Sequence, residues 1–249
     1  MKLLYQIVKN RYICSPYDLF DVLLKTNAMK RILLISSVLL ISCSLSVLSA
    51  NKNKWKPLFG TNLSDANYNP EVWSEKDGVL GAIKDESIWT TTEYENFELD
   101  LEFKTDEATN SGVVVYCTDT KNWIPNSVEI QIADDHSEHF KNAKPYEKCG
   151  AIYGHLGANK DKVVKKPGEW NHMHIKCEGQ HITVTLNGQK VTEMDMSKWT
   201  SGTTNPDGTK IPSWLPKPFA ELPTKGFIGL QGKHGNSLIW FRNAKIRSL

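Results

Sequence analysis

The segment 96–104, Asn-Phe-Glu-Leu-Asp-Leu-Glu-Phe-Lys, constrains the fold more than any other part of the sequence. Its apolar residues are Phe97, Leu99, Leu101 and Phe103, and acidic residues stand between them. A two-residue period puts alternate side chains on opposite faces of a β-strand, whereas a helix would scatter them around its axis. The segment therefore predicts a strand with one face in a core and the other in water. Such a strand needs neighbours, so the chain must build a sheet.

Further short segments have the same character and are separated by turn residues. We expect strands at 78–83, 112–116, 128–132, 151–153, 172–177, 181–186, 189–194, 227–231 and 238–246. Asn187-Gly188 stands between two alternating runs, and both residues tolerate the positive φ of a two-residue hairpin. About ten strands at such spacing, with no long run of helical period, indicate an all-β domain, a β-sandwich or jelly roll.

Residues 195–225 interrupt this rhythm. The stretch carries five prolines, two glycines, Trp199 and Trp214. A connection this long without obvious structure is usually functional or disordered, and two tryptophans argue against disorder. We expect a packed loop that flanks a site. The alternative is a surface segment that covers an edge of the sandwich.

The first fifty residues resemble an export signal rather than part of the fold. In residues 29–50, Lys30 and Arg31 precede an apolar run and small residues, as in a secretory signal peptide, and the run is too short to span a bilayer. Residues 1–28 fit poorly ahead of such a signal, so Met29 is the expected start. We therefore assign residues 51–249 to one folded domain and expect an exported protein, in the periplasm or on the outer membrane.

The end of the signal allows two kinds of processing. Residues 40–43 resemble a lipobox, in which Cys43 is lipidated, and the alternative is cleavage near Ala50. In the first case the protein is a lipoprotein whose lipid anchor is its only contact with a membrane. Residues 1–50 hold six basic and two acidic side chains, and without them the formal charge changes from +2 to −2. No basic field favours nucleic acid as a partner.

Three cysteines follow the signal: Cys117, Cys149 and Cys177. An odd number in an exported protein leaves at least one free thiol. A Cys117–Cys149 disulfide and three buried thiols both stay open, because sequence does not give connectivity. No cysteine-rich spacing typical of a metal centre occurs.

The most informative polar pattern lies in residues 128–136. Alternation directs Glu129 and Gln131 together away from the core, and Asp134 follows where the strand ends. A carboxylate beside an amide on a sheet face suits the hydroxyl groups of sugars. A carboxylate with a shifted pKa can also serve as a general base. The alternative is a solvated outer face, on which polar residues alternate without a function.

The same segment invites comparison with the Glu-x-Asp-x-(x)-Glu strand of retaining β-glucanases with the concanavalin-like jelly-roll fold. Here Gln131 stands in place of the middle Asp, and Asp134 in place of the final Glu. Retaining hydrolysis needs two carboxyl groups about 5–5.5 Å apart, and Asp is one methylene shorter than Glu. Departures at two of the three positions count against an ordinary glycosidase.

Other candidate residues are scattered along the chain. They lie beside expected strands or in glycine-flanked turns, where backbone or ligand can approach closely. These residues are Tyr153, His155, Trp170, Gln231, Lys233, His234 and Arg242. Asp135, His136 and His139 offer ligands for a divalent metal ion, but their spacing is unspecific. The sequence has no phosphate loop, dinucleotide fingerprint or Ser-His-Asp order.

Several short motifs follow one another in order over residues 55–249. They are Asn110-Ser111-Gly112, Glu129-Ile130-Gln131-Ile132, Gly150-Ala151-Ile152-Tyr153, Pro167-Gly168-Glu169-Trp170-Asn171, Asn187-Gly188, Gly226-Phe227-Ile228-Gly229-Leu230-Gln231, His234-Gly235 and Phe241-Arg242-Asn243. As a set they make the chain resemble the 3-keto-disaccharide hydrolase domain family. The resemblance implies a concanavalin A-like jelly roll with a groove on one sheet. It also implies cleavage of glycosides that a partner, a sugar 3-oxidoreductase, has oxidised to a ketone at C3.

Such a substrate changes the chemistry that is required. A C3 ketone acidifies the C2 hydrogen, so a base can form an enolate and the C1 substituent can leave by β-elimination, with water adding back for net hydrolysis. The catalytic set on this hypothesis consists of Glu129, His234, His155 and Asp134. The base is Glu129, which is slightly preferred, or His234. The substrate-binding set consists of Gln131, Tyr153, Trp170, Gln231, Lys233 and Arg242. No cofactor is specified, and a role for a divalent metal stays open.

Two other functions fit the same residues. One is a non-catalytic glycan-binding lipoprotein, and the other is an ordinary β-glycosidase of the concanavalin-like class. An enzyme needs a base with a perturbed pKa, and a binding module does not. The pKa of the candidate base therefore separates the first alternative from the enzyme.

Overall fold

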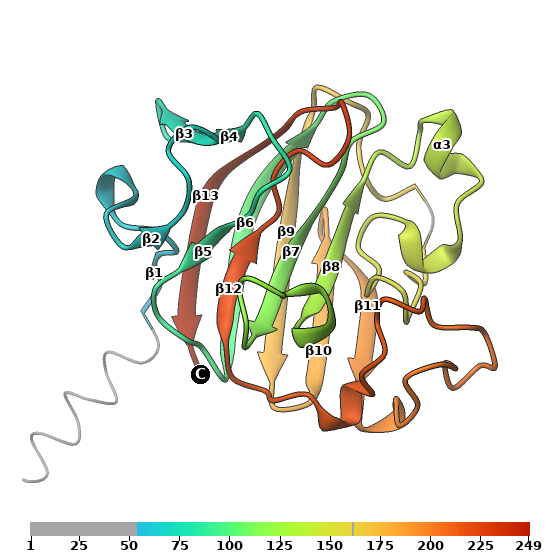
Figure 1. Cartoon of the computed structure of the whole chain (residues 1–249). Helices are drawn as coiled ribbons and strands as arrows, with labels where there is room; N and C mark the ends of the chain where they lie inside the picture. Colours follow the sequence, from blue (N-terminus) through green and yellow to red (C-terminus); the bar gives the residue numbers. More distant parts are fainter. Residues whose placement is uncertain (1–53, 161) are drawn as a thin grey trace, which may run out of the picture. The chain divides into compact units, whose positions relative to one another are not determined.

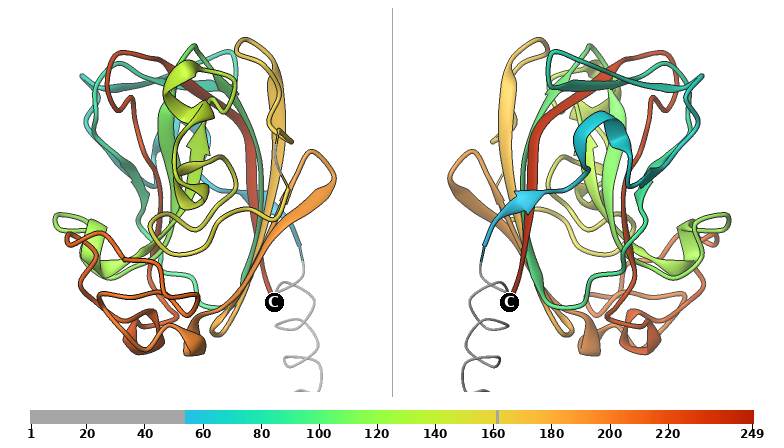
Figure 2. Two further views of the ribbon diagram at one scale, coloured as in Figure 1. Left: turned by 90° about the vertical axis from the view of Figure 1, so that its right-hand side faces the viewer. Right: turned by 90° about the vertical axis from the view of Figure 1, so that its left-hand side faces the viewer.

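The computed structural model describes residues 54–160 and 162–249, so the expectations for residues 1–50 lie outside the described part. Two antiparallel sheets pack face to face, and the side views show them as two layers (Figures 1 and 2). The expected all-β sandwich of the jelly-roll class is confirmed. No helix in residues 54–160 or 162–249 is long and apolar enough to cross a membrane.

The larger sheet has eight strands in the order β11-β10-β9-β6-β13-β4-β3, with β1 paired to β13. Its strands are β1 (Lys56–Pro57), β3 (Trp73–Lys76), β4 (Val79–Ala82), β6 (Phe97–Thr105), β9 (Trp170–Glu178), β10 (His181–Leu186), β11 (Gln189–Asp195) and β13 (Ile239–Ser248). The smaller sheet has five strands in the order β2-β5-β12-β7-β8. Its strands are β2 (Ala66–Asn67), β5 (Ile88–Thr90), β7 (Asn110–Cys117), β8 (Val128–Ala133) and β12 (Phe227–Leu230).

The connections carry only short helices. They are α3 (Glu138–Lys141) and the 3-10 turns η1 (Thr61–Leu63), η2 (Ile124–Asn126), η3 (Pro145–Glu147), η4 (Met196–Lys198) and η5 (Phe219–Glu221). The Asn187-Gly188 hairpin joins β10 to β11, and both residues have positive φ, as the sequence predicted.

The apolar faces of β6 and β8 contribute to one core between the sheets. Their core side chains are Phe97, Leu99, Leu101, Phe103, Val128, Ile130 and Ile132, and none has exposed surface. Burial of each is worth about 1.5–3 kcal/mol relative to exposure, so a shift by one residue would forfeit the whole set. The register of both strands therefore follows from their two-residue period. It also decides which side chains point outward from each sheet.

Nine of the expected strands match observed strands to within two residues at either end. The expectation for residues 151–153 is wrong: there Ile152 forms only isolated bridges, to Ile130 and to Leu156. The backbone of this segment still follows the edge of β8, with Gln131 donating to the Ala151 carbonyl at 2.9 Å. Strands β1, β2, β3 and β5 were not foreseen, because runs of two to four residues carry too little pattern.

The long segment 195–225 is packed, as predicted. Trp199 is buried and donates from Nε1 to Asn205 Oδ1 at 3.0 Å. The Asn205 amide in turn donates to the Gly154 carbonyl at 3.3 Å, which ties the segment to the region beside β8. Trp214, by contrast, is 55% exposed. The segment therefore has an anchored side and a side that faces solvent.

The three cysteines of the described chain are free, buried thiols. The Cys117–Cys149 disulfide is therefore not formed, and the alternative of three buried thiols holds. Burial raises the pKa of Cys117 to about 11 and those of Cys149 and Cys177 further. Thiols in this state are poor nucleophiles, so their role is packing.

Candidate functional site

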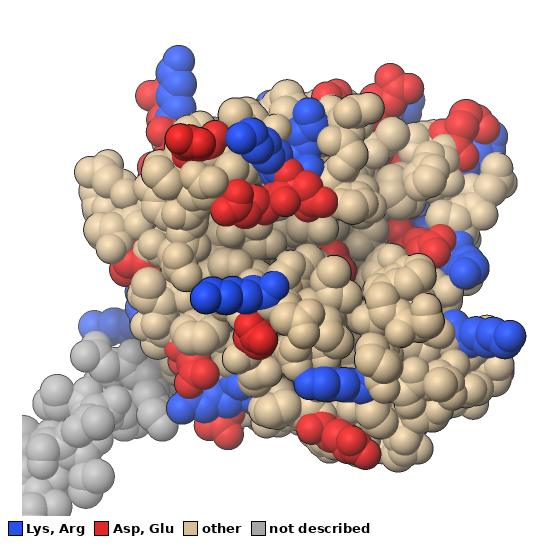
Figure 3. Space-filling view, viewed as in Figure 1, with Lys and Arg blue, Asp and Glu red and all other residues tan. Residues whose placement is uncertain are grey.

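A cavity of about 410 Å³ opens on the outer face of the five-stranded sheet. Figure 3 shows this face, which is hollowed near its middle and carries basic and acidic side chains intermingled. The cavity is lined by Asp85, Asn110, Trp123, Ile124, Glu129, Gln131, Tyr153, Trp214, Gln231 and His234. Five of the residues predicted from the sequence therefore lie together here: Glu129, Gln131, Tyr153, Gln231 and His234.

The alternation of β8 places its two polar side chains in this cavity. Because Val128, Ile130 and Ile132 point into the core, Glu129 and Gln131 project from the opposite face. The neighbouring strand β7 leaves room for them with a glycine. A Cβ at Gly112 would lie 2.3 Å from Glu129 Oε1, so no larger residue fits there while Glu129 keeps its position.

Glu129 has some exposure to the cavity, but protein surrounds its carboxyl group closely. This desolvation, with a smaller contribution from the negative charge of Asp85, raises the pKa of Glu129 to about 8. A carboxyl group with such a pKa is mostly protonated at neutral pH and can donate a proton there. Sequence reasoning preferred Glu129 as the base. Its surroundings favour the protonated acid instead.

His234 and Asp85 form a pair at the rim of the cavity. Nδ1 of His234 and Oδ2 of Asp85 are 2.5 Å apart, and both side chains are about half exposed. A carboxylate accepts a hydrogen bond from a ring N–H, so with a hydrogen on Nδ1 the other ring nitrogen, Nε2, is the one left to face a ligand. Main-chain bonds hold the two loops, because Lys233 donates to the Lys84 carbonyl at 3.0 Å and His234 to the Asn110 carbonyl at 3.3 Å.

Two glutamine side chains bring unused acceptors to the cavity. Gln131 donates from Nε2 to Asn110 Oδ1 at 2.9 Å, and this bond orients its amide. Its Oε1 is buried and has no hydrogen-bond partner among the described residues, and the same holds for Oε1 of Gln231. An unpartnered buried acceptor costs about 1–3 kcal/mol. A ligand with hydroxyl groups would satisfy both oxygens.

Aromatic and apolar side chains form the wall of the cavity. Trp214 is 55% exposed and Ile124 is 42% exposed, while Trp123 packs at a tilt against Trp89 with 6.3 Å between ring centroids. Tyr153 lies partly buried beside Glu129, and burial followed by the charge of Glu129 raises the pKa of its hydroxyl. Flat apolar walls beside convergent polar groups are typical of sites for small polar ligands such as sugars.

Two predicted residues, Asp134 and His155, are near the cavity residues in sequence but make structural contacts elsewhere. Asp134 is buried and accepts bonds from the main-chain amides of Ala108 and His136, at 2.9 and 3.1 Å. His155 is also buried, stacks on Phe219 with 3.7 Å between ring centroids, and shares a 2.9 Å bond with the Tyr153 carbonyl. Burial lowers the pKa of His155 to about 4, so its ring is neutral. Neither side chain lines the cavity.

Three further predicted residues are not in the cavity. Lys233 is half-buried and adjoins His234 without lining the cavity. Trp170 and Arg242 lie on β9 and β13 of the other sheet, where the guanidinium carbon of Arg242 stands 4.0 Å from the centroid of the Trp170 ring. Their sequence motifs are therefore separated from Glu129 by the core of the sandwich.

The described residues contain no cluster of three or more His, Cys, Asp or Glu side chains placed to hold a metal ion. The three residues considered from the sequence have separate contacts. Asp135 accepts from the Cys149 amide at 3.0 Å, His136 Nε2 contacts the Val164 carbonyl at 3.0 Å, and His139 packs edge-on against Phe140. They do not converge on one point.

Sequence reasoning missed Asp85, Trp123 and Ile124 as site residues. Asp85 lies in a turn after β4, and its place beside His234 depends on a contact between residues 149 positions apart. Trp123 and Ile124 lie in the β7–β8 connection and carry no periodic signal. For the wall of this cavity the sequence offered one indication, Trp214, which lies in the long segment expected to flank a site.

Comparison with known proteins identifies a family that matches this chain. Residues 54–247 match the model of a family described as the 3-keto-alpha-glucoside-1,2-lyase-like domain. Among functionally curated proteins, no significant match is found.

Two crystal structures from Parabacteroides distasonis ATCC 8503 are similar to the chain, and both proteins were provisionally named glycosyl hydrolases. One is 86% identical over 79% of this chain and 100% of its own, with a TM-score of 0.78. The other is 24% identical over 78% of this chain and 94% of its own, with a TM-score of 0.61, and it supports the fold alone.

Proposed function

We propose, from the premise that the chain belongs to the 3-keto-α-glucoside-1,2-lyase-like family, that the cavity on the five-stranded sheet cleaves the glycosidic bond of 3-keto-glycosides. The membership supports a carbohydrate-active protein. The substrate class and the mechanism are the proposal. The observation that carries it is the meeting, in one cavity, of a carboxyl group that is protonated at neutral pH and a histidine oriented by a carboxylate.

The proposed reaction is a β-elimination across C1 and C2 of the oxidised sugar. His234 Nε2 takes the C2 proton, whose acidity comes from the C3 ketone, and the C2–H electron pair enters the enolate. The C1–O bond then breaks as the C1=C2 double bond forms, and Glu129 gives its proton to the departing oxygen. Addition of water to the enone would complete net hydrolysis. No oxocarbenium ion forms, so no second carboxylate is required.

The remaining cavity residues bind and position the sugar. The open oxygens of Gln131 and Gln231 accept hydrogen bonds from its hydroxyl groups. Trp214 offers an exposed indole face beside them. Asp85 acts as a positioning residue, because its bond to Nδ1 keeps Nε2 free to accept the proton.

An ordinary retaining glycosidase is less compatible with this cavity. Its second carboxylate would have to be Asp134, which is buried and bonded to two main-chain amides. The other acid in the cavity, Asp85, is engaged with His234.

The test uses a chromogenic glucoside and its 3-keto derivative as a matched pair, with release of the chromophore as the readout. We expect release from the keto form only, and a fall in kcat as pH rises through about 8, where Glu129 loses its proton. A rise in kcat over the same pH range would make Glu129 the base instead. Release from the plain glucoside would favour the ordinary glycosidase over the proposed reaction. Binding of both compounds without release from either would indicate a glycan-binding protein.

A further inference from the structure

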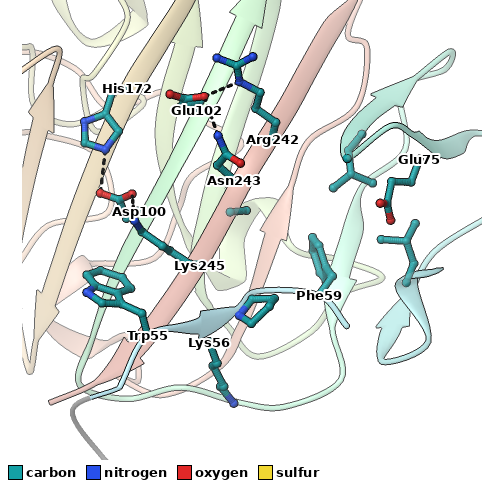
Figure 4. Close-up of a pocket in the computed structure, with 15 residues that line it drawn as sticks. Trp55, Lys56, Phe59, Glu75, Asp100, Glu102, His172, Arg242, Asn243 and Lys245 are labelled. Carbon is teal, nitrogen blue, oxygen red and sulfur yellow. Dashed lines mark hydrogen bonds and ion pairs between the residues drawn. The ribbon is translucent and has the colours of Figure 1, made fainter. Parts of the chain in front are cut away.

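A second cavity, of about 630 Å³, lies on the outer face of the eight-stranded sheet. It is lined by residues of β1, β3, β4, β6, β9 and β13 and of the loops beside them, and these residues are drawn in Figure 4. The sandwich core separates it from the cavity that contains Glu129, since the two are on the outer faces of opposite sheets. None of the reaction steps proposed above uses it.

Acidic side chains of β6 form the floor of this cavity, with basic side chains on both sides. Asp100 accepts from His172 of β9 at 2.8 Å and pairs with Lys245 of β13 at 3.3 Å. Glu102 pairs with Arg242 and accepts from the Asn243 amide at 3.0 Å. Figure 4 shows these side chains side by side above the three strands. The outward positions of three neighbouring strands therefore form one polar surface.

An irregularity in β13 brings two of its neighbouring side chains, Arg242 and Asn243, to the same acidic residue of β6. Between Arg242 and Lys245 the pairing with β6 shifts, and Asn243 has a φ of 54°, as in a β-bulge. The extra residue turns the Asn243 amide toward Glu102 as well as the Arg242 side chain. Bulges of this kind redirect side chains at binding sites.

An exposed tryptophan borders the polar surface. Trp55 is 36% exposed and precedes β1, whose pairing with β13 keeps it beside Lys245. Lys245 Nζ and Arg247 Cζ lie 5.4 and 4.8 Å from the centroid of its ring, and His174 meets it edge-on at 6.4 Å. These contacts hold the indole in place while much of it stays open to solvent.

The charges that line the cavity balance one another, which favours a neutral ligand over an ionic one. Three basic side chains (Lys56, Arg242 and Lys245) and three acidic ones (Glu75, Asp100 and Glu102) line it, so no net charge attracts an ion. The paired groups still have capacity to bond. Arg242 contacts Glu102 through Nε, which leaves its terminal N–H groups, and Oε1 of Glu102 has no partner among the described residues. Adjacent donors and acceptors beside an indole match the vicinal hydroxyls and apolar face of a pyranose.

We propose that this cavity is a second, non-catalytic binding site for a neutral oligosaccharide. It would hold a glycan chain on the face opposite the reaction site and would not take part in bond cleavage. The inference rests on the geometry of the outer sheet alone, and it stands or falls separately from the proposed reaction.

Calorimetric titration of the protein with maltoheptaose and with cellohexaose tests the proposal. We expect at least one of them to bind. Trp55→Ala and Glu102→Gln should each weaken this binding and raise its Kd by roughly tenfold or more. Trp214→Ala, which alters the other cavity, serves as the control and should retain this binding. Trp55→Ala should also keep chromophore release from the 3-keto-glucoside within about twofold of the wild type, because the sites are far apart.

Two results would overturn the second site: no binding of either oligosaccharide, or binding that depends on Trp214 and not on Trp55 or Glu102. Binding that depends on Trp55, in a protein that releases nothing from the 3-keto-glucoside, would support the second site and count against the proposed reaction.

Discussion

The outer faces of the two sheets carry similar residue types, but the surroundings of their carboxyl groups differ. On the eight-stranded sheet, Asp100 and Glu102 are each paired with cations. On the five-stranded sheet, no cation among the described residues pairs with Glu129, and its pKa rises to about 8. Both faces also contain an Asp–His pair, Asp100–His172 and Asp85–His234.

The difference shows which feature makes a polar surface reactive. Carboxylates that are paired with cations on an open sheet have their charge compensated and can still form hydrogen bonds to a neutral ligand. A carboxyl group that is desolvated without a partner keeps its proton at neutral pH and becomes an acid. The same alternation of strand residues yields either outcome, depending on what the neighbouring strand and loops place opposite.

The largest expected effect separates the two carboxyl groups directly. Glu129→Gln removes the proposed proton donor with little change in shape, and should lower kcat on the 3-keto-glucoside by about 10²–10⁴-fold. Glu102→Gln, the matched change on the other sheet, should leave kcat within about twofold. Equal turnover of a folded Glu129→Gln protein and the wild type would remove Glu129 from the mechanism.

A second pair of variants addresses the space around Glu129. A methyl group at Gly112 would collide with the Glu129 side chain, so Gly112→Ala should displace the carboxyl and reduce kcat by about 10²-fold. At Gly81 on β4 a Cβ would lie 3.3 Å from Trp240 Cδ1, which is a mild contact on the other sheet. Gly81→Ala should leave kcat unchanged. Full activity of Gly112→Ala would show that the placement of Glu129 by β7 is unimportant.

The two Asp–His pairs allow a third comparison. Asp85→Asn should reduce kcat by about 10–10²-fold with little change in KM, because it disturbs the tautomer of His234 and leaves the sugar contacts in place. Asp100→Asn makes the same change beside His172 and should affect neither constant. If Asp85→Asn raised KM alone, Asp85 would be a binding residue rather than a positioning one.

The smallest effect concerns stability and its dependence on pH. The folded pKa of Glu129 lies above that of an unfolded Glu, near 4.5, so its contribution is present in full below pH 4.5 and is lost as pH rises through about 8. Relative to Glu129→Gln, the wild type should lose roughly 1–3 kcal/mol of unfolding free energy over this range, a figure reduced for the partial exposure of the side chain. Urea denaturation at several pH values measures it. Parallel curves for the two proteins would contradict the raised pKa.

Much of the fold was predictable because period-two alternation acts locally. In β6 and β8 each apolar residue has to face the core, and this requirement determines the outward direction of Glu129 and Gln131 as well. The short strands β1 and β5 escaped prediction because they exist through pairing with distant partners, Ile246 for Lys56 and Gly229 for Trp89. No local pattern records such pairings.

The amino-acid sequence by itself determined nine of the strands, the hairpin at Asn187-Gly188, the family and the group Glu129, Gln131, Gln231 and His234. Only the tertiary structure decided that Trp170 and Arg242 belong to the opposite face, and that Asp85 stands beside His234. It also decided that Glu129 holds its proton at neutral pH. The reason is physical: side-chain direction follows from neighbours along one strand, whereas the pKa of a carboxyl group depends on every group that folding brings around it.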